Sequence, residues 1–191
     1  PNWRGAKLLA ALAQKTYWLL VLRSDIGAAP GDVLAVKGLR IGAAPGPEVA
    51  LRRLLVEAGI DLEADQVQIA PVPGAAEPGV SFGVHAAQSL QNGTIDGFWA
   101  NAMGTEAAVR SGAGTVLLDV RRGIGPSAAQ DYTFAALLTT EKMIEEKAVI
   151  GGEGNGGVII TAIDPGRDAA AGLALVLEAM ASTGQSLAEL I

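Results

Sequence analysis

A short turn ahead of a predicted helix carries groups that could bind an anion. Ala44, Pro45 and Gly46 lie directly before Pro47 and Glu48, where the helix is expected to open. Unpaired backbone N–H groups and the helix dipole favour a negative charge at such a position by about 0.3–1 kcal/mol. The turn would suit a sulfonate, nitrate or carboxylate group, and the alternative is an ordinary connection between a strand and a helix.

Two further turns carry polar or aromatic side chains at the ends of predicted strands. Trp99 could form a flat wall against a ring or alkyl group, and Asn101 offers a donor and an acceptor. Their alternatives are a core position and a helix cap. Asp119, Arg121 and Arg122 lie at the end of another predicted strand. An arginine could pair with an anionic solute, although a solvated surface is the favoured interpretation for this pair.

The residues for most catalytic chemistry are absent from the sequence. There is no cysteine and a single histidine, His85, so disulfides, thiol nucleophiles and multi-histidine metal sites are excluded. His85 is expected on a helix surface. No GxSxG elbow and no GxxxxGK[ST] phosphate loop occur. We therefore predict no catalytic residue, no metal and no cofactor.

Charge and hydropathy exclude two more classes of protein. The net charge is −6 and no run of basic residues occurs, which is unfavourable for binding nucleic acid. No apolar run approaches the roughly 20 residues that a membrane span requires. Half of the residues are hydrophobic, so a folded core is expected.

Apolar runs and helical stripes alternate over the first three quarters of the chain. They predict strands over 16–22, 38–43, 67–72, 95–100, 115–120 and 132–139, and helices over about 47–58, 84–91, 101–112 and 141–146. This order predicts an α/β fold, a three-layer αβα sandwich with a mostly parallel sheet. The run over 115–120 is almost wholly apolar and is expected to be a central, buried strand. Because solutes bind beyond the carboxyl ends of such strands, the turns over 43–47, 99–102 and 119–125 should share one rim.

The last part of the chain has a different character. A glycine-rich stretch over 151–157 precedes a β-rich run and a helix that ends at Gly184. The spacing Gly152-x-Gly154-x-x-Gly157 fits the dinucleotide fingerprint, but a strand and not a helix follows it, so that interpretation is rejected. A capping box at Ser186 and Glu189 then predicts the start of a helix that the sequence does not complete. Together with the start at Pro1, this predicts a fragment.

Residues from about 15 to 146 resemble ABC-importer solute-binding proteins of the nitrate, sulfonate, taurine and thiamine-precursor branch. The segments that carry this resemblance are KGLRIGAAPGPEVALRRLLVEAGID, LQNGTIDGFWAN, GTVLLDVRRG and YTFAALLTT. The resemblance implies a periplasmic-binding-protein type II lobe, with a hinge strand near 16–22 and the other lobe missing. Expected domains are 1–37 (hinge strand and remnant of the first lobe), 38–147 (solute-binding lobe) and 148–191 (tail). It also implies a small solute, possibly anionic or pyrimidine-like, and an ABC permease and ATPase as partners.

The tail VIGGEGNGGVI and GRDAAAGLALVLEAM resembles the third domain of α-phosphohexomutases. That resemblance implies sugar contacts at Glu153 and Asn155, but the phosphoserine and magnesium loops of the family have no counterpart in the sequence. The main hypothesis is a solute-binding component of an importer, periplasmic or anchored outside the membrane, and not an enzyme. The alternatives are a sugar-phosphate-binding fragment, or a fusion of both pieces without a joint function.

Overall fold

The computed structural model describes residues 6–142, 150–152, 158–160 and 169–186. The chain divides into two compact units. The sheet unit comprises Ala13–Ala135, and the tail unit comprises Pro1–Leu12 with Ala136–Ile191.

A five-stranded sheet forms the centre of the sheet unit, in the order β4-β3-β5-β2-β6. β3 pairs in parallel with both β4 and β5, whereas β2 is antiparallel to β5 and to β6. Four of the five strands therefore share one direction, which confirms a mostly parallel sheet. The strands are β2 (Leu19–Arg23), β3 (Arg40–Ala43), β4 (Gln68–Ala70), β5 (Gly97–Ala100) and β6 (Gly114–Leu118).

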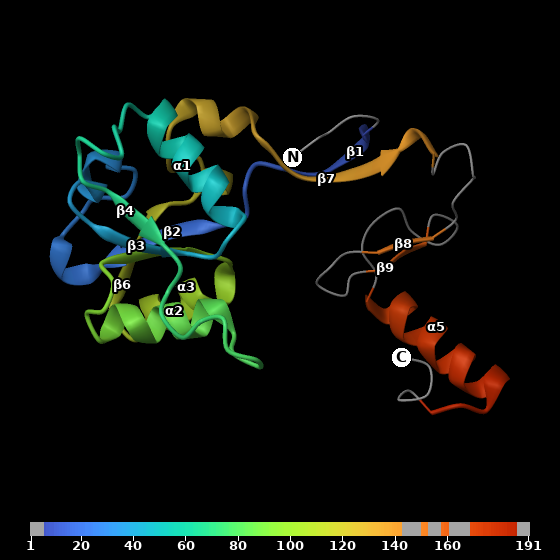
Figure 1. Cartoon of the computed structure of the whole chain (residues 1–191). Coiled ribbons are helices and arrows are strands. Elements are labelled where there is room, and N and C mark those ends of the chain that lie inside the picture. Colours follow the sequence, from blue (N-terminus) through green and yellow to red (C-terminus); the bar gives the residue numbers. More distant parts are fainter. Residues whose placement is uncertain (1–5, 143–149, 153–157, 161–168, 187–191) are drawn as a thin grey trace. The chain divides into compact units, whose positions relative to one another are not determined.

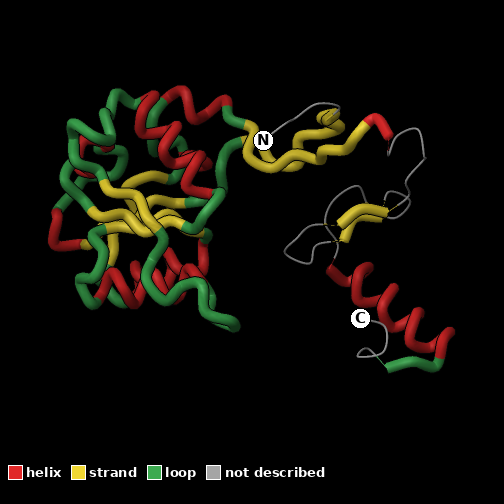
Figure 2. Tube along the Cα trace, in the orientation of Figure 1, coloured by secondary structure: helices red, strands yellow, loops and turns green. Residues whose placement is uncertain are grey.

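Helices cover both faces of this sheet, as the α/β pattern predicted. α1 (Pro47–Glu57) lies on one face, and α2 (Phe82–Gln91) and α3 (Ala102–Arg110) lie on the other (Figures 1 and 2). Successive strand residues point to opposite faces. Leu20, Leu22 and Trp99 thus join the core beneath α1, while Val21 and Phe98 join the core beneath α2 and α3. The three-layer sandwich is confirmed.

Small residues allow α2 and α3 to approach closely. A Cβ atom on Gly104 would lie 2.3 Å from the carbonyl oxygen of Gly83 and 2.6 Å from its Cα. No side chain fits in that space, so the two glycines fix the distance between the helices. This contact places the start of α3, and with it the turn after β5, against α2.

The expectation that residues 115–120 form a central strand was wrong, because β6 is an edge strand and β2 occupies the interior of the sheet. The sequence of β6 is nevertheless apolar, because helices and loops cover both faces of this strand and bury Leu117 and Leu118. The loop between two short 3-10 helices, Ser24–Ile26 and Val33–Val36, protects the open edge. In it, Gly31 N–H donates to the Leu117 carbonyl at 2.7 Å.

The strand that we expected to be a hinge, within residues 16–22, is β2 and lies inside the five-stranded sheet. β1 (Ala6–Gln14), which the sequence pattern did not predict, pairs with β7 (Thr133–Thr140) in a separate two-stranded sheet. The chain passes between the two units within these two strands, at residues 12–13 and 135–136.

The tail unit also contains an antiparallel pair, β8 (Ile150–Gly152) and β9 (Val158–Ile160), and the helix α5 (Ala169–Thr183). The helix agrees with the apolar stripe that predicted it. Among the helices that the structure describes, none has the length and apolarity needed to cross a membrane.

Candidate functional site

The carboxyl ends of β3, β4, β5 and β6 lie at one edge of the sheet. Pairing of Ala43 with Trp99, and of Leu20 with Leu118, aligns these ends, and β2 begins at the same edge because it runs the other way. The turns over 43–47, 99–102 and 119–125 therefore follow strands that end on a common rim. The segment that leads into β2 brings Thr16 to this rim as well.

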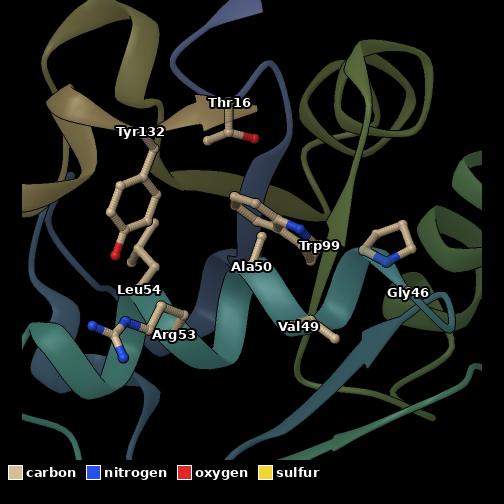
Figure 3. A pocket seen from close by; sticks show the side chains of 9 residues that line it. Thr16, Gly46, Val49, Ala50, Arg53, Leu54, Trp99 and Tyr132 are labelled. Carbon is tan, nitrogen blue, oxygen red and sulfur yellow. The ribbon is translucent and has the colours of Figure 1, made fainter. Parts of the chain in front are cut away.

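A hollow of about 410 Å³ opens at this rim, beside the first two turns of α1 (Figure 3). Its walls come from four separate parts of the sheet unit: the segment before β2, helix α1, the end of β5 and the residue before β7. The lining residues are Thr16, Gly46, Pro47, Val49, Ala50, Arg53, Leu54, Trp99 and Tyr132. Most are apolar, so the hollow would accept an alkyl or aryl group without leaving polar groups unpaired.

The start of α1 forms one end of the hollow. Gly46 is the N-cap residue, with φ 92° and ψ −68°, and Pro47 occupies the first turn. No described side chain caps this helix start. Glu48 N–H and Val49 N–H turn back to the carbonyls of Ala44 and Gly46, at 3.2 and 3.0 Å. The start of α1 thus lines the hollow without a side-chain hydrogen-bond cap, and Glu48 is the acidic residue of its first turn.

Trp99 forms a wall of the same hollow. Its side chain is fully buried, and its indole Nε1 has no hydrogen-bond partner among the residues that the structure describes. A buried donor without a partner costs about 1–3 kcal/mol. Trp18 packs against the ring at 6.3 Å between centroids and helps to hold its orientation. A residue that lines the hollow therefore carries a buried N–H donor without a partner among the described residues.

A polar cluster of three side chains lies at the other end of the hollow. Arg53 Nε and the Tyr132 hydroxyl donate to the two different carboxylate oxygens of Glu57. The hydrogen bond from Tyr132 lowers the pKa of Glu57, partial burial opposes this shift, and Arg53 adds to it. Burial and the bond to Glu57 raise the pKa of Tyr132. Sequence reasoning missed this cluster because Glu57 and Tyr132 are 75 positions apart.

The other predicted contacts are distributed around the rim. Asn101 is the N-cap residue of α3 and is exposed, and its side chain does not cap the helix. Asp119 accepts from the backbone N–H of Arg122 at 3.3 Å and caps the short 3-10 helix Val120–Arg122. Asp119, Arg121 and Arg122 line a different hollow of about 740 Å³ beside α3 and β6. Gly46 and Trp99 therefore converge, whereas Asp119 lies elsewhere on the rim.

Glu153 and Asn155 lie outside the described residues. His85 is half-buried on α2, and its Nε2 lies 2.7 Å from the Pro73 carbonyl, so it links the helix to the preceding loop. Among residues 6–142 and the described parts of the tail, no group of three or more histidine, cysteine, aspartate or glutamate side chains could hold a metal ion.

Comparison with solved structures identifies the fold. A putative periplasmic sulfonate-binding protein of a sulfonate ABC transporter from Methylobacillus flagellatus matches with a TM-score of 0.52 and 18% identity, over 74% of this chain and 38% of that one. The alkanesulfonate-binding protein from Xanthomonas axonopodis, bound to MOPS, matches with a TM-score of 0.50 and 14% identity, over 74% and 43%. The fold is periplasmic-binding-protein-like. This confirms the first resemblance, at the level of the fold.

The periplasmic-binding-protein-like chain spans about two fifths of the length of the solved structures that it matches. The family model for phosphoglucomutase/phosphomannomutase, alpha/beta/alpha domain III, matches residues 138–191. This match confirms the second resemblance, in the tail. No curated protein matches the sequence.

Proposed function

We propose that the sheet unit binds a small anionic solute, of the sulfonate class, in the hollow beside α1. The observation that carries this proposal is Trp99, which lines the same hollow as the uncapped start of α1 and whose buried indole N–H has no partner among the described residues. An anionic oxygen at this end would accept from the indole and lie against the positive helix end.

The uncapped helix start and the apolar walls favour different parts of such a solute. Backbone N–H groups of the 44–46 turn would hold the anionic head. Pro45 and Pro47 have no N–H to donate, but their fixed φ angles would shape the turn. Val49, Ala50 and the Trp99 ring would contact a hydrocarbon tail. Asn101 does not line the hollow itself, and it would contact the solute from the next turn of the rim, two residues after Trp99. Asp119 is not part of this proposal, because it lines another hollow and its carboxylate would repel an anion.

In the whole protein this unit would act as the solute-binding component of an ABC importer. The solved structures that share the fold are named as periplasmic sulfonate-binding and alkanesulfonate-binding proteins, one of them bound to the sulfonate MOPS. A second lobe would close over the rim, and an ABC permease and ATPase would receive the solute. The protein would work in the periplasm or anchored outside the membrane, without catalysis.

Nuclear magnetic resonance of the ¹⁵N-labelled chain tests the proposal directly, because each indole N–H gives its own signal. Titration with propanesulfonate should shift the Trp99 indole signal, which is assigned by its loss in Trp99→Phe. Loss of one charge-assisted hydrogen bond should weaken binding about tenfold in that variant. Trp18→Phe is the control, since Trp18 touches Trp99 but does not line the hollow. A Trp99 signal that stays fixed with propanesulfonate, nitrate and sulfate would overturn the proposal.

A second candidate rests on the family match over residues 138–191. In it, Glu153 and Asn155 of the tail would contact the hydroxyl groups of a sugar phosphate, without mutase chemistry. Glucose phosphate should then shift backbone signals of residues 150–160, and Glu153→Gln should abolish the effect. If only the sulfonate or only the sugar phosphate binds, the other piece is a fusion partner without a binding role of its own.

A further inference from the structure

The solute hollow has a second polar end, which the anion site at α1 does not use. We propose that Arg53 is a specificity-determining residue that selects solutes with a second anionic group, opposite the first. This inference rests on the proposed binding of a sulfonate beside Gly46 and Trp99, and it narrows the solute class to sulfonates that also carry a terminal carboxylate.

The geometry of α1 sets the distance between the two ends. Gly46 and Arg53 are separated by about two turns of helix, which is roughly 10 Å along the axis. Val49 and Ala50 line the wall between them, and in Figure 3 Arg53 and Tyr132 lie together beyond these residues, away from Gly46. A linear solute held by its sulfonate at Gly46 would therefore lay its chain on an apolar wall and end beside Arg53.

The Arg53 guanidinium has donors left for a second anionic partner besides Glu57. The Nε–H of Arg53 donates to Glu57, but the guanidinium has five N–H groups in all. The Arg53 side chain is 70% exposed. Arg53 balances the charge of Glu57 and the Tyr132 hydroxyl donates to its other oxygen, which together reduce the repulsion between Glu57 and an incoming carboxylate. Glu57 still competes for the guanidinium, so the preference in the natural chain should be modest.

The test compares two solutes of equal length in the same chain: hexanesulfonate, and sulfohexanoate, which replaces the terminal methyl group with a carboxylate. Affinities are read from the Trp99 indole signal. We expect sulfohexanoate to bind about threefold more tightly, as for an exposed ion pair. The preference should vanish in Arg53→Met and should increase in Glu57→Gln, where the competing carboxylate is removed. The preference is the ratio of the two affinities within one protein, so a general effect of a substitution on the hollow cancels.

Arg110→Met provides the matched control, because Arg110 forms the same type of pair four residues from Glu106 on α3 and does not line the hollow. The Arg110→Met variant should prefer sulfohexanoate over hexanesulfonate to the same extent as the natural chain. Arg53→Lys, which keeps the charge but loses the fork, should retain part of the preference. Thermal unfolding verifies that each variant is folded.

The outcomes separate the two proposals. Equal affinity for both solutes, or a preference that survives in Arg53→Met, overturns the role of Arg53 and leaves the sulfonate site intact. If neither solute moves the Trp99 signal, the proposed function fails and this inference fails with it. A preference that is abolished only in Arg53→Met, and not in Arg110→Met, supports the assignment.

Discussion

Trp99 combines a core role with an unsatisfied polar group. Its ring fills the layer between the sheet and α1, yet its indole N–H has no partner in the described part of the chain. Core positions usually avoid this cost by using phenylalanine or leucine. Under the proposed function a solute oxygen would accept from the indole, and the cost of the unpaired group in the free protein can be measured.

Trp99→Phe should change the free energy of unfolding by less than about 1.5 kcal/mol without solute. Removing the unpaired donor recovers part of a desolvation cost of about 1–3 kcal/mol, and this offsets the cavity left by the smaller ring. Urea denaturation measures the change. Phe98→Leu, which also shortens a fully buried ring in β5, should cost more because it has no unpaired donor to remove. A Trp99→Phe loss larger than that of Phe98→Leu would contradict the explanation.

Gly46→Ala should destabilise the chain by about 1–3 kcal/mol, because φ 92° is unfavourable for any residue with a Cβ. No atom lies within 4 Å of the added Cβ, so the cost comes from the backbone and not from a clash. Gly38→Ala is the control, with φ 74° and equal space, but away from the hollow. Both should lose stability in urea denaturation, while only Gly46→Ala should weaken propanesulfonate binding. Unchanged stability in Gly46→Ala would contradict the argument.

At the scale of elements, the packing of α2 on α3 decides where the turn after β5 lies. The helices touch through Gly83 and Gly104, at a distance that excludes every side chain. Ridge-and-groove packing tolerates some variation in side-chain size, but a contact between backbones does not. The rim at Asn101 depends on this crossing.

Gly104→Ala should lower the free energy of unfolding by at least about 2 kcal/mol, despite the better helix propensity of alanine. The added Cβ would meet the Gly83 backbone at 2.3 Å, and a backbone cannot move aside as a flexible side chain does. Met103→Ala, at a position of the same helix that is 63% exposed, should change stability by less than about 0.5 kcal/mol. Chemical denaturation compares the two. Equal losses would show that the helices can separate without penalty.

At the scale of the whole molecule, an ion-pair network ties three strands together at the edge of the sheet opposite the hollow. Asp96 accepts from Arg40 through its backbone N–H at 3.0 Å and its Nε at 2.8 Å, and from Arg23 at 3.3 Å. These groups belong to the start of β3, the turn before β5 and the end of β2. The Asp96 side chain is only 13% exposed, so this network is screened less by solvent than the surface pairs.

The hydrogen bonds from Arg40 lower the pKa of Asp96, and partial burial opposes that shift. A carboxyl whose pKa is lower in the folded state stabilises the protein above its unfolded pKa, and this contribution is lost as the pH falls through the folded pKa. Asp96→Asn should cost about 2 kcal/mol at neutral pH. It should also flatten the decline of stability between about pH 5 and pH 2. Asp25→Asn, which removes the exposed partner of Arg23, should change stability by under about 0.5 kcal/mol. Urea denaturation at several pH values measures both, and a steep acid decline that persists in Asp96→Asn would contradict the role.

Much of the sheet unit followed from periodicity and turn residues. The helix at Pro47, the strand over Gly97–Ala100 and the glycine that ends each helix are local features, so the sequence was sufficient to predict them. The same logic failed at β6, since burial on both faces makes an edge strand as apolar as a central one. It also missed β1, whose pairing with β7 depends on residues far away in the chain.

The sequence by itself determined that the turns after β3, β5 and β6 share one edge, because parallel strands joined by helices place their carboxyl ends together. It also determined that Trp99 and its neighbour Phe98 face opposite sides of the sheet, because side chains alternate along a strand. Only the tertiary structure decided which side α1 covers. That choice put Trp99 beside the start of α1, brought Tyr132 to Arg53 and Glu57, and left Asp119 at another hollow, since alternation fixes opposite faces but not the helix that packs on each.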